Sequence, residues 1–148
     1  MQQTEQAKKQ YQKMVERVSP GSRTFANSLK AFVVGGLICD VGQLIRNLLL
    51  KGGVSEDHTA IYTAVILVFL GVLLTGLGVY DKIGKFAGAG SVVPITGFAN
   101  SVAAPAIEYK KEGYVLGVGA KMFLVAGPVI VYGTLAATVV GLIYYFVK

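Results

Sequence analysis

Residues 90–105, GSVVPITGFANSVAAP, decide the fold, because this stretch carries no charge and yet contains residues that interrupt helices. Pro94 and Pro105 each remove a backbone donor, and glycine is a weak helix former. Lipid offers no hydrogen bonds to freed backbone groups, so broken main chain at membrane depth survives only against protein or water. The stretch therefore predicts a segment that enters a membrane without facing lipid.

The uncharged segment extends from Lys85 to Glu108 and is long enough to cross a bilayer. It either dips in as two short helices around Pro94–Gly97 or crosses with an unwound middle. Helix ends near the midplane attract anions through free N–H groups and the helix dipole. A glycine-rich packing segment without a ligand is the alternative. The side chains expected to contact a solute are Ser91, Thr96, Asn100 and Ser101.

The composition of the whole chain also favours lipid. Hydrophobic residues make up 53% and charged residues 15%, and the mean hydropathy is +0.59. The net charge is +6, but the basic residues precede or end the apolar runs. That pattern indicates membrane orientation with a cytoplasmic N-terminus and argues against nucleic-acid binding. Five basic residues precede the first apolar run: Lys8, Lys9, Lys13, Arg17 and Arg23.

The chain divides into a basic cytoplasmic lead, residues 1–27, and a helical membrane domain, residues 28–148. The lead predicts an amphipathic helix over residues 3–18, which lies on lipid, against a partner or in solvent. Regular spans are expected at about 28–50 and 59–80, followed by a broken region at 84–127 and a last span at 128–147. The predicted fold class is an all-α polytopic integral membrane protein with a broken or re-entrant region.

The last apolar run, residues 114–147, is too long for one upright crossing. Gly127 and Pro128 are expected to divide it into a half-length helix, 114–126, and the full span. A single tilted and kinked helix is the alternative.

Polar side chains inside the apolar runs are candidates for a solute pathway. Asp40 and Gln43 share one helical face with Gly36 and Asn47. A carboxylate at mid-span is costly in lipid, so this face is expected to meet protein or water. Lys121 either reaches the headgroups or offers a fixed positive charge inside the protein.

Two stripes of small residues predict close helix packing within or between subunits. The first stripe is Gly71, Thr75 and Gly78, and the second is Gly133, Ala137 and Gly141.

No constellation of catalytic residues stands out, so we expect no enzyme activity, cofactor or metal site. The single cysteine, Cys39, has no histidine near it in sequence to act as a base. His58 follows two acidic residues in a short loop, which is a weak metal pattern.

Residues 90–133, GSVVPITGFANSVAAPAIEYKKEGYVLGVGAKMFLVAGPVIVYG, closely resemble the SpoVA family of endospore-forming bacteria. The spacing of the first two spans and the basic N-terminus also fit. Two membrane subunits of the family share this signature, and the 27-residue lead favours the one with the longer N-terminal region.

The resemblance implies a complex of the forespore and spore inner membrane, with the N-terminus on the spore-core side. Such a complex moves dipicolinate, chelated with calcium, into the forespore and releases it at germination. This chain is then similar to a channel-forming subunit linked to opening under membrane tension. Implied partners are the membrane subunit AEb and the soluble subunit AD, in a homo- or hetero-oligomer. A structural subunit that anchors another channel protein is the alternative.

Overall fold

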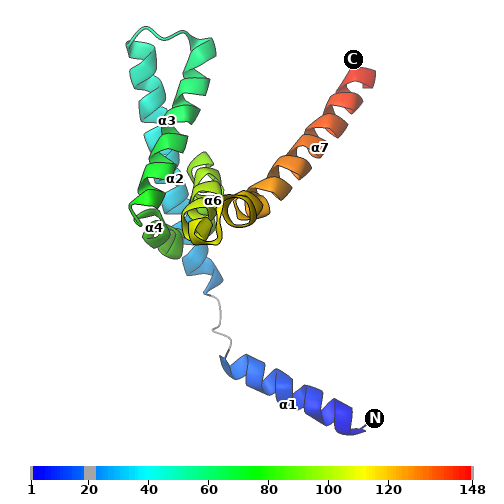
Figure 1. Ribbon diagram of the computed structural model, residues 1–148. Coiled ribbons are helices and arrows are strands. Elements are labelled where there is room, and N and C mark those ends of the chain that lie inside the picture. The colour runs from blue at the N-terminus through cyan, green and yellow to red at the C-terminus, as the bar shows by residue number, and fades with distance from the viewer. Residues whose placement is uncertain (1, 19–22, 148) are drawn as a thin grey trace.

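The computed structural model describes residues 2–18 and 23–147, and every element in these ranges is helical (Figure 1). This confirms the predicted all-α class. The amphipathic helix predicted in the lead is α1 (Gln2–Val18), whose apolar Tyr11 and Met14 are exposed. The sequence Ser19-Pro20-Gly21 predicts the end of this helix, but these residues lie outside the described part of the chain.

Two long apolar helices, α2 (Thr24–Lys51) and α3 (Glu56–Gly76), form a hairpin with a short connection (Figure 1). Their most apolar windows have mean hydropathies of 1.5 and 2.2, and both helices are long enough to cross a membrane. The helices approach closely at Gly42, where a Cβ would lie 3.3 Å from Leu67 Cδ1. α2 begins before the expected residue 28, so part of the predicted lead belongs to the first long helix.

The second long helix, α3, ends at Gly76. The sequence predicted that it would extend to Tyr80. Gly78 has a φ of +68°, which glycine adopts without steric strain. The N–H groups of Gly78 and Val79 donate to the carbonyls of Thr75 and Leu74, the hydrogen-bond pair of a Schellman helix end. Gly78 therefore ends the helix, and a Cβ there would meet nothing within 4 Å, so this residue packs against no other helix of the described chain.

The broken region contains α4 (Tyr80–Ala87), α5 (Ala89–Val92) and α6 (Ile95–Glu108). α5 and α6 are separated at Pro94, whose extended backbone precedes the first turn of α6. Gly97 lies inside α6, so the interruption is shorter than the Pro94–Gly97 stretch. Asp81 and Glu108 line the same hollow. The segment thus returns to the end of the hairpin from which it started, as in the re-entrant alternative.

A 3₁₀ turn (Tyr109–Glu112) and a π-helical turn (Tyr114–Gly119) connect α6 to the last helix. The last helix, α7 (Phe123–Val147), continues through Pro128. The expected division at Gly127–Pro128 is therefore wrong, and the interruption lies between Gly119 and Phe123. Proline at the sixth helical position removes one backbone bond, which membrane helices tolerate.

α7 differs from the other long helices in its surroundings. In Figure 1 it starts beside α6 and runs away from the hairpin, ending near the level of the α2–α3 connection. From Pro128 to Val147 every residue is exposed, whereas α2 and α3 keep half-buried residues along much of their length. The packed part of the molecule is therefore formed by α2 to α6.

Candidate membrane site at the broken helix

Tyr80 holds the interruption between α5 and α6 in place. Its side chain is 4% exposed, and its hydroxyl lies 2.7 Å from the Ser91 carbonyl oxygen and 2.9 Å from Thr96 Oγ1. A carbonyl only accepts, so the single Tyr80 proton goes to Ser91 and the Thr96 hydroxyl donates to Tyr80. The phenol therefore satisfies a carbonyl that the broken helix leaves free.

Sequence reasoning missed this role of Tyr80 and placed the residue at the end of a span. The sequence did contain an indication of this role. Tyr80 directly precedes the charged pair Asp81–Lys82, and tyrosine has an apolar ring and a polar tip. Such a side chain is suited to the boundary between an apolar packing layer and buried backbone polar groups.

Glycines allow α5 to lie directly against α2 and the start of α6. A Cβ at Gly90 would overlap the backbone of Ala31, including its carbonyl oxygen. A Cβ at Gly35 would lie 3.3 Å from the Gly90 carbonyl oxygen. A Cβ at Gly97 would overlap the carbonyl oxygens of Ser91 and Val92, so the sharp turn at Pro94 requires glycine there.

α6 packs along α3 through one glycine and one polar contact. A Cβ at Gly71 would lie 2.9 Å from the Thr96 carbonyl oxygen. One turn later, the Thr75 hydroxyl lies 2.7 Å from the Gly71 carbonyl oxygen and 2.9 Å from Asn100 Oδ1. Gly71 and Thr75 thus meet α6 within the same chain.

The polar side chains predicted to contact a solute bond mostly to their own segment. The Ser91 hydroxyl donates to the Gly88 carbonyl at 3.0 Å, and the Ser101 hydroxyl donates to the Phe98 carbonyl at 2.7 Å. Thr96 bonds to Tyr80. Asn100 also lines the hollow that contains Asp81 and Glu108, so its amide borders accessible space.

The polar residues of α2 lie apart from this cluster. Asp40 and Gln43 are exposed, and Gln43 Nε2 donates to Asn47 Oδ1 at 2.9 Å. No hydrogen bond or ion pair involves the Asp40 carboxylate within residues 2–18 and 23–147. A carboxylate on a long apolar helix requires water or a polar neighbour. We therefore expect this face of α2 to meet another subunit or an aqueous path.

Lys121 contacts an aromatic ring. Its ammonium lies 5.1 Å from the centroid of the Tyr109 ring, within the range of a cation–π interaction. Gly127 and Pro128 lie further along the chain in α7, and Pro128 is exposed. The structure therefore does not gather Lys121 and these two residues around the α5–α6 interruption.

The second stripe of small residues has no neighbour in the described chain. Gly133 and Gly141 have nothing within 4 Å of an added Cβ, and Ala137 is exposed. The two stripes therefore differ, because only the first contacts another helix of the same chain.

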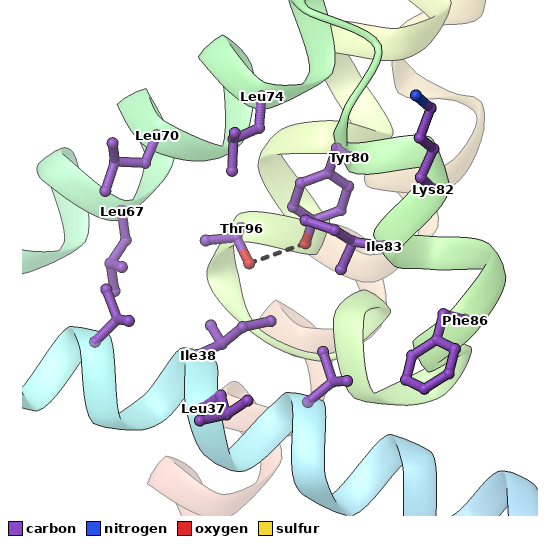
Figure 2. Close-up of a pocket in the computed structure, with 12 residues that line it drawn as sticks. Leu37, Ile38, Leu67, Leu70, Leu74, Tyr80, Lys82, Ile83, Phe86 and Thr96 are labelled. Carbon is purple, nitrogen blue, oxygen red and sulfur yellow. Dashed lines mark hydrogen bonds between the residues drawn. The ribbon is translucent and has the colours of Figure 1, made fainter.

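A groove borders the Tyr80–Thr96 contact on the side of α2, α3 and α4 (Figure 2). Its volume is about 560 Å³, and its walls are almost entirely leucine, isoleucine, valine and phenylalanine side chains. The Thr96 hydroxyl at its base is bonded to Tyr80.

Three apolar helices and a re-entrant broken pair define this chain as a polytopic α-helical membrane protein. Residues 27–143 match the model of the SpoVAC/SpoVAEB sporulation membrane proteins, so the chain belongs to this family. It is 50% identical over 139 residues to stage V sporulation protein AC of Bacillus subtilis (strain 168), covering 93% of each chain. No solved structure matches the chain.

Proposed function

We propose that this sporulation membrane protein is a channel-forming subunit that moves dipicolinate, with calcium, across the forespore or spore inner membrane. The re-entrant α5–α6 pair is the observation that carries the proposal. Broken backbone at membrane depth is tolerated only against protein or water, and here Tyr80 and glycine contacts hold it in place. Discontinuous helices of this kind form the solute sites of many transporters.

The N-terminal end of α6 offers a suitable electrostatic environment for an anionic solute. This helix begins after Pro94, next to the interior contact between Thr96 and Tyr80. The N-terminus of a helix favours negative charge through its dipole and free N–H groups. Dipicolinate is a small dianion, so donor groups at this helix end and weak polar contacts along the path suit its carboxylates.

The pathway residues remain those of the sequence hypothesis, now with different proposed roles. Pro94 and Gly97 form the constriction, and Ser91, Thr96 and Ser101 hold its shape. Asn100, Asp40 and Gln43 form polar walls. Lys121, Gly127 and Pro128 belong to the α6–α7 side of the path.

Several copies are needed to enclose a path, because three membrane helices and a re-entrant pair are too few to surround one. The polar face of α2 then lies between subunits. The proposed partners are the membrane subunit AEb and the soluble subunit AD of the same complex.

The N-terminus is proposed to lie on the spore-core side. Lys82, Lys85 and Lys110 belong to the segment at the end of the hairpin where α2 begins (Figure 1), as the positive-inside bias favours. Single cysteines at Glu112 and Ser55, in a Cys39→Ser background, test this. An impermeant thiol reagent should reach position 112 only from the spore-core side and position 55 only from the opposite side. The reverse pattern, or labelling of both from one side, contradicts the proposed topology.

Flux through liposomes tests conduction. Purified protein should release trapped dipicolinate, with faster release under osmotic tension. Asp40→Asn and Lys121→Gln should change the flux without loss of insertion, and Leu135→Ala on exposed α7 is the control. A Gly97→Leu variant is less informative, because its Cβ already overlaps backbone. Equal flux from protein-free and protein-containing liposomes would exclude an autonomous channel.

A second function, a structural subunit that anchors another channel protein, is favoured by the exposed face of α7. It predicts no flux from this chain alone but normal flux once its partner subunit is added. In that case Asp40→Asn should leave the flux of the reconstituted pair unchanged.

A further inference from the structure

The groove between α2, α3 and α4 has the chemistry of a site for an apolar chain (Figure 2). Leu37 and Ile38 of α2 face Leu70 and Leu74 of α3 across it. Its volume of about 560 Å³ lies within the usual range of ligand pockets. Because the hydroxyls of Tyr80 and Thr96 in its lining are already bonded to each other, the interior offers little to a polar ligand.

α4 closes one end of this groove with an amphipathic turn of helix. Tyr80 and Ala87 are buried, and Ile83 and Phe86 line the groove. The charged side chains of α4, Asp81, Lys82 and Lys85, are exposed. A short helix with one apolar and one charged face is typical of the membrane–water interface, so α4 is expected to lie at headgroup depth.

Two positive charges at the rim have no ion-pair partner in the part of the chain that the structure describes. The stem of Lys82 lines the groove. The ammonium of Lys30 lies 5.0 Å from the centroid of the Phe86 ring, which forms a wall of the groove. Lys85 differs, because it pairs with Asp81 at 2.8 Å.

We propose that this groove holds an acyl chain of an anionic phospholipid, whose negative headgroup is attracted by Lys30 and Lys82 at the rim. An apolar groove that ends at two unpaired cations is complementary to an amphiphile with a negative head. The bound chain packs against the Tyr80–Thr96 contact, so lipid supports the interruption between α5 and α6. This proposal does not depend on dipicolinate transport.

A lipid suits the groove better than a helix of a second copy. The α2 residues that line it extend from Val34 to Val41, which is roughly 10 Å of helix and much less than a span of ~30 Å. α7, whose residues from Pro128 onward are all exposed, carries no charged residue to meet the two lysines if it packs here from a second copy. A partner helix is therefore one outcome that the test must detect.

The absence of tryptophan from the chain permits a direct test by fluorescence quenching. Leu70→Trp places a reporter in the groove, and Leu135→Trp places a control on exposed α7. Full-length protein is reconstituted in phosphatidylcholine vesicles with increasing brominated phosphatidylglycerol or brominated phosphatidylcholine. The groove reporter should show saturable quenching with several-fold preference for the anionic lipid, whereas the control should follow bulk composition.

Matched charge variants test whether the preference for anionic lipid depends on the two lysines at the rim of the groove. Lys30→Gln and Lys82→Gln should each reduce the anionic preference about fivefold, from the usual attraction of one basic residue near an anionic surface. Lys110→Gln with Lys111→Gln removes two exposed lysines outside the groove and should leave the preference unchanged.

Three results would overturn the proposal. Equal quenching of Leu70→Trp by both brominated lipids would indicate ordinary surrounding lipid. Complete protection from both would indicate that protein fills the groove. An equal loss of preference in the Lys110/Lys111 double variant would indicate a diffuse electrostatic effect. If Leu70→Trp fails to insert as a helical protein, Phe86→Trp at the rim replaces it as reporter, with the same expected and contradicting results.

Discussion

The α5–α6 region and α7 are both apolar and rich in small residues, yet they differ in how far the rest of the chain buries them. Ser91 and Ala99 in the first region are 1% and 5% exposed, and the backbone there contacts α2 and α3 directly. In α7 only Ala126 is buried. The first region therefore packs against other helices of the same chain, whereas the surface of α7 must be covered by lipid or by other subunits.

The comparison shows that spacing of small residues does not by itself locate a contact. Gly71 and Gly133 each begin a stripe of small residues spaced three or four positions apart. A Cβ at Gly71 would lie 2.9 Å from a backbone oxygen of α6, but one at Gly133 would meet nothing within 4 Å. The difference depends on where the neighbouring segment turns back, which is a property of the tertiary structure.

The largest effect on stability is expected for Gly90→Val. Its Cβ would overlap the Ala31 backbone of α2, and neither backbone can move without separating the helices. Overpacking of this kind costs about 3 kcal/mol. Unfolding in mixed micelles, followed by circular dichroism, measures the loss.

Gly36→Val is the matched control for this substitution, because Gly36 lies on α2 and has nothing within 4 Å of an added Cβ. Its free energy of unfolding should change by less than about 0.5 kcal/mol. Similar losses in both variants would mean that valine is unfavourable in this protein for reasons unrelated to the α2–α5 contact.

A smaller loss is expected for Tyr80→Phe. This change leaves the Ser91 carbonyl without its donor and the Thr96 hydroxyl without its acceptor, at a cost of about 2 kcal/mol. Thr96→Val leaves the Tyr80–Ser91 bond intact and should cost only about 1 kcal/mol. The order of the two losses in the same unfolding assay tests the assigned direction of the hydrogen bonds. A greater loss in Thr96→Val would contradict it.

Much of the fold followed from the sequence, because lipid imposes simple constraints on length and charge. The hydropathy of the first two runs predicted α2 and α3, and Pro94 predicted the interruption. The ends were less predictable. Pro128 was expected to stop a helix, but one missing backbone bond was insufficient, whereas the left-handed backbone of Gly78 ended α3 early.

The candidate site was less predictable than the fold. The sequence identified Ser91, Thr96 and Asn100 by polarity, but it did not show that their hydroxyl and amide groups bond within the chain. Tyr80 was missed because its partners lie beyond a turn whose direction depends on Gly97. Such contacts follow from three-dimensional packing and not from local spacing.

A still smaller effect is expected for Lys121→Gln, which removes the ammonium above the Tyr109 ring. A cation–π contact contributes about 0.5–1 kcal/mol at an exposed site. Lys121 is half-buried, and we expect its substitution to lower the free energy of unfolding by an amount of this order. The same unfolding assay measures the loss, with exposed Lys111→Gln as the control. If Lys121→Gln alters dipicolinate flux but not unfolding, the positive charge acts on the solute and not through the ring.

The smallest effect on the stability of the chain is expected for the double variant Gly133→Leu and Gly141→Leu in α7. Both sites are open, so the free energy of unfolding should change by less than about 0.5 kcal/mol. Small residues permit close approach of membrane helices, so self-association or binding to a partner subunit should weaken about tenfold, or 1.4 kcal/mol. Energy transfer between labelled copies in vesicles measures association, with Val139→Leu as the control.

The two measurements separate the possible roles of α7. Loss of association without loss of folding indicates that its small-residue face is an intersubunit contact. Unchanged association indicates that this face meets lipid, and the exposed stripe then has no packing role. A loss of folding in the double variant would contradict the comparison itself, because α7 would then contribute to the packed region despite having only Ala126 buried.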